Sequence, residues 1–247
     1  MGLKRSQLRI LYLQIREDGA TRAEELQEFI AYSGLEEHQF LTLNVFDTPN
    51  FYAEKASECD AVFVGGSSDA SVLDPLRYPF VEDAKVLLAY CVRESIPVFA
   101  SCFGFQLAVE ALGGKVIADP DRMEMGVYPM QLLPAARDDL LLHDVSNGFL
   151  AISGHKERAL TLPDRTVCLA STERCPYHAL KAIGKPFYAF QFHPELNPQD
   201  LAARIQRYQS RYFDDDNRLQ QILASLQETP DANRLIAKFV DRILLSY

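Results

Sequence analysis

The sequence is poor in positive charge and in long hydrophobic runs, and each shortage excludes a class of protein. Its 25 Lys and Arg residues are outnumbered by 34 Asp and Glu residues, which gives a formal net charge of −9. A general nucleic-acid binder would present a basic face, so we expect no nucleic-acid partner. A membrane span needs about 20 consecutive apolar residues. No stretch of the sequence approaches that length, so we expect no membrane partner either.

Cysteine is scarce, and its distribution is not that of a disulfide framework. The cysteines are odd in number and widely scattered, which is typical of a reducing compartment; they are Cys59, Cys91, Cys102, Cys168 and Cys175. The apolar stretch over 8–15 is short and is interrupted by Gln14, so we do not expect a signal peptide. A cytoplasmic location is therefore the expectation.

A metal centre is the one further role that these residues suggest. Cys168, Cys175 and His178 are close enough in sequence to be considered as ligands, but their spacing matches no familiar zinc pattern. Ordinary packing is the favoured interpretation, and we expect neither a metal ion nor another cofactor. We expect His178, like His38 and His143, on the surface or in loops.

Strand-like and helix-like segments alternate along the first part of the chain. Strands are expected over 8–13, 40–45 and 60–64, and helices over 23–32 and 81–93. This alternation predicts an α/β domain whose mostly parallel central sheet is covered by helices on both faces. Further strands, which we expect to extend the edge of the same sheet, are predicted over 128–133, 166–170 and 186–189.

The C-terminal part of the sequence is typical of two helices separated by Pro230. Each has its apolar residues on one helical face: Leu219, Ile222, Leu223 and Leu226 in the first, and Leu235, Ile236, Phe239, Val240, Ile243 and Leu244 in the second. We predict one domain over 1–205 and a helical extension over 206–247 packed on its outside. The alternative is a docking surface for a partner subunit or a second copy.

The segment from Val98 to Gln106 has the pattern of a strand, a tight turn and a helix. Cys102 lies at the turn, with Ala100 and Gly104 two residues away on either side. Small residues are needed there because the strand and the helix pass close together. The turn also places the thiol at a helix N-terminus, where the partial positive charge favours a thiolate. A buried structural cysteine is the alternative interpretation.

A second polar cluster follows another apolar strand. Phe190-Gln191-Phe192 leads into His193, Pro194 and Glu195. Residues i and i+2 of an extended segment point the same way, so the carboxylate of Glu195 can lie beside the imidazole of His193. A nucleophilic cysteine needs a base, and that base needs an orienting partner.

These segments resemble the class I glutamine amidotransferase family, whose nucleophile motif is Gly-x-Cys-x-Gly-x-Gln and whose base motif is His-Pro-Glu. The resemblance implies a flavodoxin-like fold and a catalytic triad of Cys102, His193 and Glu195. Val62-Phe63-Val64-Gly65-Gly66-Ser67 resembles the family's glycine pair, which makes the N–H groups of Gly66 and Phe103 candidates for an oxyanion hole.

The resemblance also suggests substrate-binding residues, although four positions depart from the family pattern. Gln106 is expected to bind substrate, with packing in its helix as the alternative, and His155 falls where the family has His-x-Asp. Glu157 replaces that aspartate, which puts the role in doubt. The departures near the nucleophile and the glycine pair are Ala100, Ser101 and Ser67.

Three functions follow from this interpretation. The first is a stand-alone glutaminase or amidotransferase that hydrolyses glutamine through a cysteinyl thioester and passes ammonia to a separate synthetase subunit, since the sequence has no Gly-x-x-x-x-Gly-Lys-Ser/Thr loop. It resembles the stand-alone relatives of the guanylate synthase amidotransferase domain. The second is hydrolysis of a γ-glutamyl peptide or γ-glutamyl amide by the same triad. The third is a non-catalytic binding or regulatory protein on the same fold. A second copy of the chain is a further candidate partner.

Overall fold

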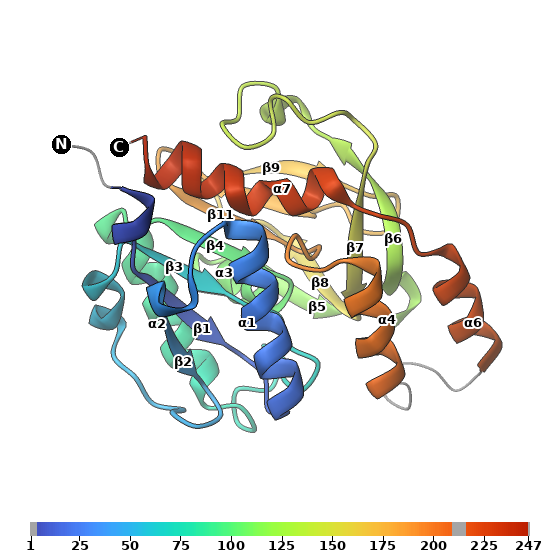
Figure 1. The fold of residues 1–247 in the computed structure, drawn as a ribbon, viewed down its shortest axis with the longest axis horizontal. Helices are drawn as coiled ribbons and strands as arrows, with labels where there is room; N and C mark the ends of the chain where they lie inside the picture. The colour runs from blue at the N-terminus through green and yellow to red at the C-terminus, as the bar shows by residue number, and fades with distance from the viewer. Residues whose placement is uncertain (1–3, 209–215, 247) are drawn as a thin grey trace.

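Nine strands form one mixed sheet in the order β2-β1-β3-β4-β11-β10-β9-β6-β7 (Figure 1). The computed structural model describes residues 4–208 and 216–246. The strands are β1 (Ile10–Gln14), β2 (Phe40–Asn44), β3 (Ala61–Val64), β4 (Val98–Ser101), β6 (Glu124–Leu132), β7 (Phe149–His155), β9 (Thr166–Ser171), β10 (Ala179–Ala182) and β11 (Phe187–Phe190). From β2 to β11 all neighbouring strands are parallel, and beyond β11 they are antiparallel.

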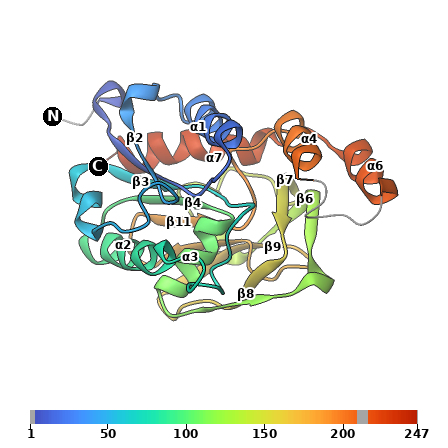
Figure 2. The ribbon, with the colours of Figure 1, turned by 90° about the horizontal axis from the view of Figure 1, so that it is seen from below.

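Helices cover both faces of the parallel half, as the sequence predicts (Figure 2). The helices are α1 (Gly19–Ser33), α2 (Phe80–Glu94), α3 (Phe103–Ala111), α4 (Pro198–Arg207), α6 (Asp216–Ser225) and α7 (Pro230–Phe239), and α7 continues into a π-helical turn over Val240–Leu244. In Figure 2, α1 and α7 lie on one side of the sheet and α2 and α3 on the other. Short 3-10 turns occur at Arg5–Gln7, Glu37–Gln39, Ala53–Glu58, Pro120–Arg122 and Pro134–Ala136.

The strands alternate their side chains between two hydrophobic clusters. In β1, Ile10 and Tyr12 belong to the cluster beneath α1 and α7, whereas Leu11 and Leu13 belong to the cluster beneath α2 and α3. Because every residue of such a strand is buried, β1 has the continuous apolar character of a central parallel strand. The predicted α/β fold is therefore confirmed.

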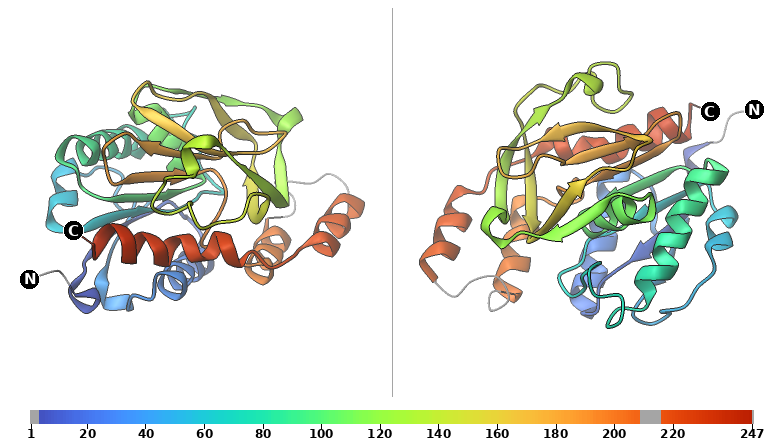
Figure 3. Two further views of the ribbon diagram at one scale, coloured as in Figure 1. Left: turned by 90° about the horizontal axis from the view of Figure 1, so that it is seen from above. Right: turned by 180° about the vertical axis from the view of Figure 1, so that it is seen from behind.

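The antiparallel half is larger than the sequence analysis predicted. It adds β10, β9, β6 and β7 to the sheet, and β5 (Lys115–Ala118) pairs with β8 (Glu157–Thr161) in a separate two-stranded sheet (Figure 3). Long β6 and β7 carry this half of the sheet past the parallel core and toward α4 and α6.

The helix α7 packs on one face of the central sheet and buries its apolar side there (Figure 1). Leu235, Ile236 and Phe239 are fully buried, and the Phe239 ring contacts Phe63 and Phe99 of the central strands at centroid distances of 5.9 and 5.4 Å. By contrast, α6 contributes Leu219 to a small cluster with Leu201 and Ile205 of α4. None of the helices in the described parts of the chain has the length and apolarity to cross a bilayer.

Candidate active site

Cys102 lies at the turn between β4 and α3, with a backbone conformation that residues other than glycine rarely adopt. Its φ and ψ angles are 48° and −99°, and strain of this kind persists where the surrounding structure fixes it. The Cys102 N–H donates to the carbonyl of Phe190 at 2.7 Å, so the turn is tied to the end of β11. The thiol is therefore held at the first turn of α3, as predicted.

The close approach of strand and helix at this turn requires glycine at position 104. A Cβ atom there would lie 2.9 Å from Cγ1 and 3.0 Å from the carbonyl oxygen of Val64. On the other side of the turn, Ala100 pairs with Val64 of β3 and Ala189 of β11. The departure from the family pattern at Ala100 is thus accommodated within an ordinary parallel strand.

The predicted base, His193, and its predicted partner, Glu195, follow β11 directly. The backbone N–H of His193 donates to the carbonyl of Ile152 in β7 at 2.8 Å, which fixes where the turn begins. His193 Nδ1 lies 2.6 Å from Oε1 of Glu195, and both side chains are buried. The adjacency of imidazole and carboxylate that the i, i+2 spacing predicts is present in the structure.

Cys102 and His193 meet across the turn. Both side chains lie against Gly66, where a Cβ atom would be 3.0 Å from His193 Cε1 and 3.6 Å from Cys102 Cβ. Burial alone would lower the pKa of His193, but the charges of Cys102 and Glu195 outweigh it and raise that pKa to about 10. This environment favours an imidazolium beside the sulfur at neutral pH.

Glu195 is suited to stay ionised. Burial alone would raise its pKa, but the neighbouring charge of His193 lowers it below the ordinary value for a glutamate. A buried carboxylate that accepts from the imidazole fixes the ring's tautomer and stabilises its protonated form.

The sequence analysis missed Gln191, which borders the sulfur. This residue is fully buried, and its Nε2 lies 3.9 Å from Cys102 Sγ. On another side, Cys102 Sγ lies 3.7 Å from the carbonyl oxygen of Gly154. The only signal in the sequence was its position two residues before His193, which puts both side chains on one side of an extended segment.

The N–H of Gly66, predicted as an oxyanion donor, is already engaged. It donates to Oε1 of Glu25 at 3.1 Å, so in this structure it is directed at a carboxylate. Ser67, which replaces the usual proline, turns the loop by accepting from the N–H groups of Asp69 and Ala70 at 3.1 and 3.0 Å. The N–H of Phe103, the second predicted donor, lies at the first residue of α3, where helix geometry leaves such groups without an intrahelical partner.

Glu25 belongs to a buried ion pair beneath the glycine loop. Its Oε1 accepts from Nε and Nη2 of Arg16 at 2.9 and 2.7 Å, and its Oε2 accepts from the Tyr12 hydroxyl. Arg16 Nη1 also lies 3.0 Å from the Ser68 hydroxyl. Burial and the negative charge of Glu25 together raise the pKa of Tyr12. The sequence pattern gave no sign of this network, because its members are distant in the chain.

A cavity of about 160 Å³ opens beside the sulfur. Cys102, Phe103, Gln106 and His155 all line it, so the predicted nucleophile shares a cavity with both residues predicted to bind substrate. The Gln106 amide donates to the carbonyl of Glu157 at 3.1 Å, which also anchors it to the protein.

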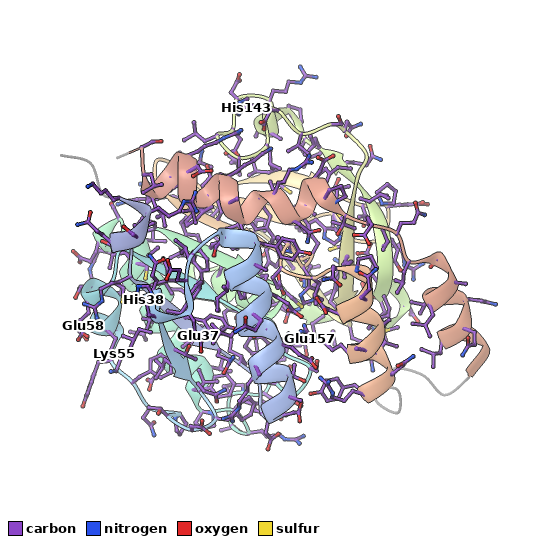
Figure 4. The ribbon with its side chains drawn as sticks, viewed as in Figure 1. Glu37, His38, Lys55, Glu58, His143 and Glu157 are labelled. Atoms are coloured by element: carbon purple, nitrogen blue, oxygen red, sulfur yellow. The ribbon has the colours of Figure 1, made fainter. Side chains whose placement is uncertain are left out.

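Glu157, the replacement for the family aspartate, closes one side of this cavity. Its carboxylate accepts a hydrogen bond from Ser71, and burial raises its pKa. In Figure 4, His143 lies at the upper edge of the molecule and His38 at its left, both well apart from Glu157. These two histidines are exposed, as predicted.

His178 lies in the loop before β10, which agrees with the expectation of a surface or loop residue, but it is not at the surface. It is fully buried, and its Nε2 lies 2.7 Å from Oε2 of Glu124, which is also 3.3 Å from Nε2 of His155. Burial alone would raise the pKa of Glu124, but these hydrogen bonds lower it well below its ordinary range. Burial lowers the pKa of His155. The predicted substrate-binding ring thus directs one nitrogen away from the cavity.

The same cluster brings potential metal ligands together, although in a different set from the one considered in the sequence. Ligand atoms of His155, Cys175 and His178 lie within 4.8 Å of one another, and Cys168 is not among them. A ring nitrogen that donates to Glu124 carries a proton and is not a metal ligand in that state. Burial raises the pKa of Cys175 to about 12. The arrangement is that of a neutral thiol beside a hydrogen-bonded network.

Comparison with known proteins agrees with this geometry. The family model described as glutamine amidotransferase class-I matches residues 26–208. Among curated proteins, the chain is 28% identical over 179 residues to the GMP synthase [glutamine-hydrolyzing] of Chromobacterium violaceum, an alignment that covers 70% of this chain and 32% of that protein. It is 37% identical over 115 residues to that of Marinomonas sp., covering 44% and 22%. The chain therefore spans about a third or less of these relatives.

Solved structures show the same fold. A glutamine amidotransferase from Thermotoga maritima superimposes with a TM-score of 0.77 at 16% identity, covering 96% of this chain and 98% of that one. A glutamine amido transferase from Methylobacillus flagellatus gives a TM-score of 0.71 at 18% identity, covering 94% of each chain.

Proposed function

Because this chain belongs to the class I glutamine amidotransferase family, we propose that it hydrolyses the side-chain amide of glutamine through a thioester on Cys102. The observation that carries the proposal is the assembly of Cys102, His193 and Glu195 from segments far apart in the sequence, with Cys102 lining a cavity. A thiolate, a proton-holding imidazole and an orienting carboxylate are the groups that acyl transfer from an amide requires.

In the first half of the reaction the sulfur of Cys102 forms a bond to the amide carbon, and the carbonyl electrons move to its oxygen. His193 holds the proton and gives it to the departing nitrogen, so ammonia leaves and a γ-glutamyl thioester remains. Glu195 stabilises the charged ring through its bond to Nδ1. In the second half His193 removes a proton from water, which attacks the thioester, releases glutamate and restores the thiolate.

The negative oxygen of each tetrahedral intermediate needs fixed donors. The N–H of Phe103 is one, at the start of α3. The N–H of Gly66 becomes a second only if its hydrogen bond to Glu25 breaks and the peptide turns toward the sulfur. On this proposal the glycine loop rearranges when substrate or a partner binds.

The ammonia acceptor is proposed to be a separate synthetase. The curated relatives are named as glutamine-hydrolysing GMP synthases, and this chain matches only a part of their length. A cytoplasmic amidotransferase subunit that supplies ammonia to a nucleotide-activating partner fits that relation, and a second copy of this chain is the other partner to test.

The proposal is tested by incubating the purified chain with glutamine and measuring glutamate and ammonia, alone and with a synthetase. Cys102→Ala should abolish turnover, and 6-diazo-5-oxo-norleucine, a glutamine-mimicking electrophile, should label Cys102 before the other cysteines. A wild-type chain that neither hydrolyses glutamine nor is labelled at Cys102 would support the non-catalytic binding function instead.

One observation favours a γ-glutamyl peptide or amide as an alternative substrate. Ser68 lines the cavity beside the sulfur and also a neighbouring cavity of about 510 Å³. The larger cavity includes Asp69 and Arg77, so it offers both charges to a substituent on the amide nitrogen. Comparing kcat/KM for glutamine with that for γ-glutamyl dipeptides and glutathione conjugates distinguishes the two substrates.

A further inference from the structure

A buried asparagine of the C-terminal helix α7 contacts the turn that carries the triad carboxylate. The Nδ2 of Asn233 donates to the carbonyl oxygens of Pro194 and Leu196 at 2.8 and 2.7 Å. Its side-chain oxygen accepts from the Thr229 hydroxyl at 3.2 Å. Only 6% of Asn233 is exposed. The two donor bonds join the C-terminal extension directly to the active-site turn.

The two carbonyls belong to the residues immediately before and after Glu195. Asn233 therefore spans the backbone at the point from which the catalytic carboxylate projects. The other end of the turn is held by the hydrogen bond from His193 N–H to Ile152 of β7. Between these anchors, His193 and Glu195 are fixed relative to each other.

The carboxylate itself has few other restraints. Oε1 of Glu195 is held by His193, whereas Oε2 is buried and has no hydrogen-bond partner from another residue in the described parts of the chain. A carboxylate held at one oxygen depends on its backbone for placement. The hydrogen bonds from Asn233 supply that placement.

The orientation of the Asn233 amide is determined by its surroundings. Turning the amide over would set its oxygen against two carbonyl oxygens and its NH₂ group against the Thr229 hydroxyl, and would lose both donor bonds. Helix α7 resists displacement, because its Leu235 and Phe239 side chains are fully buried against the sheet. The donor is thus presented by a rigid element.

We infer that Asn233 is a positioning residue for the catalytic reaction. From helix α7 it fixes the turn that holds the carboxylate of Glu195 beside the imidazole of His193. This inference rests on the proposed function, because it assigns Asn233 its effect through the triad. It also gives the C-terminal extension a part in catalysis, since displacing α7 would release the turn.

The test compares Asn233→Ala and Asn233→Asp with the wild-type chain. Asn233→Asp keeps the shape but replaces the donor with a carboxylate oxygen facing two carbonyls. Misplacing a catalytic group by about 1 Å costs up to about 10²-fold in rate, so we expect kcat for glutamine to fall by roughly 10- to 100-fold while KM changes little. We also expect the alkaline limb of the pH profile to move to lower pH, because Glu195 no longer supports the imidazolium fully.

Three further variants separate positioning from stability. Thr229→Val keeps the donor but removes the hydroxyl that orients the amide, and should give a smaller loss of kcat. Ile243→Ala removes buried volume further along the same C-terminal segment and should lower the melting temperature without moving the pH profile. Arg234→Ala, on the exposed side of α7, should change neither.

A second measurement tests this inference without requiring that glutamine is the substrate. The rate at which iodoacetamide alkylates Cys102 is measured against pH in the wild-type chain and in Asn233→Ala. A shifted profile in the variant, absent from Ile243→Ala, supports the inference even if glutamine is not the substrate. If Asn233→Ala behaves like Ile243→Ala in both readouts, the inference is overturned, and the proposed function stands on its own tests.

Discussion

At the scale of single residues, the residues within short sequence motifs were predictable, but the distant residues that hydrogen-bond to their surroundings were not. Cys102, His193 and Glu195 each belong to a short pattern in which strand, turn and helix are local in sequence, so their chemistry could be inferred from spacing. The side chains of Glu25 and Asn233 form hydrogen bonds to backbone groups of residues that are far away in the chain. No local pattern reports such a contact, because a hydrogen bond to a distant backbone group leaves no spacing to detect.

Glu195→Gln should shift the pH dependence of activity. The ionised carboxylate is one of the groups that, against the effect of burial, raise the pKa of His193 to about 10. The wild-type imidazolium therefore persists at neutral pH and is lost as the pH rises through that value. Without the negative charge the pKa of His193 falls, and the alkaline limb of kcat/KM should move to lower pH. Circular dichroism checks that the variant is folded. If the alkaline limb of its kcat/KM profile then stays at the wild-type pH, a group other than His193 controls that limb.

Gly104→Ala should destabilise the protein. The added methyl group would lie 2.9 Å from Val64 Cγ1 and 3.0 Å from its carbonyl oxygen, and overpacking of this kind costs about 1–3 kcal/mol. Urea denaturation measures the free energy of unfolding. Gly113→Ala is the matched control for steric contact, because nothing lies within 4 Å of the position of its Cβ, although its φ of 94° adds backbone strain.

At the scale of elements, the parallel strands were well predicted, whereas of the antiparallel strands in the sheet β6 and β9 were predicted and β7 and β10 were missed. The strands predicted over 8–13 and 60–64 correspond to β1 and β3, because a strand buried on both faces is a continuous apolar run. The strand predicted over 40–45 corresponds to β2, which lies at the edge of the sheet and is partly exposed. The strand β7 was missed: its burial is interrupted at Leu150 and Gly154, and it contains the glycine and the histidine that line the site. A strand whose burial is interrupted in this way has no such run.

A buried ion pair joins Arg16, which follows β1, to Glu25 of α1, and breaking it should be costly. In Glu25→Ala the Arg16 guanidinium, whose side chain is only 2% exposed, would be left without its carboxylate. Removing one partner of a buried pair costs about 3–5 kcal/mol, and we expect a loss of that size in urea denaturation.

The double variant Arg16→Met with Glu25→Ala is the control for this effect. It removes the uncompensated charge, so part of the lost stability should return. If the double variant is no more stable than Glu25→Ala, the cost does not come from the unpaired guanidinium, and packing of the Glu25 side chain would explain it.

At the scale of the whole molecule, the position of α7 could not be read from the sequence. The periodicity of its apolar residues correctly predicts that the helix has an apolar face. It does not show which surface of the protein this face packs against. In the structure that surface is the central sheet, where Phe239 meets Phe63, Phe99 and Tyr188. The aromatic residues of the strands supply a partner that only the assembled fold brings together.

The Phe239→Ala variant should therefore unfold at a much lower denaturant concentration than the wild-type protein. The side chain is fully buried, and Phe→Ala changes in cores cost about 3–5 kcal/mol. Leu226, just after α6, is only partly buried, so Leu226→Ala is expected to cost less. Equal losses for the two variants would mean that α7 contributes no more to the core than the outer segment does.

The placement of α7 over the sheet also has a consequence for biosynthesis. Residues 230–239 leave the ribosome after every described strand has been made, so the aromatic face formed by Phe63, Phe99 and Phe190 stays uncovered until then. Exposed apolar surface of this kind attracts other nascent chains. Until α7 docks, the nascent polypeptide therefore presents a face on which such association can start.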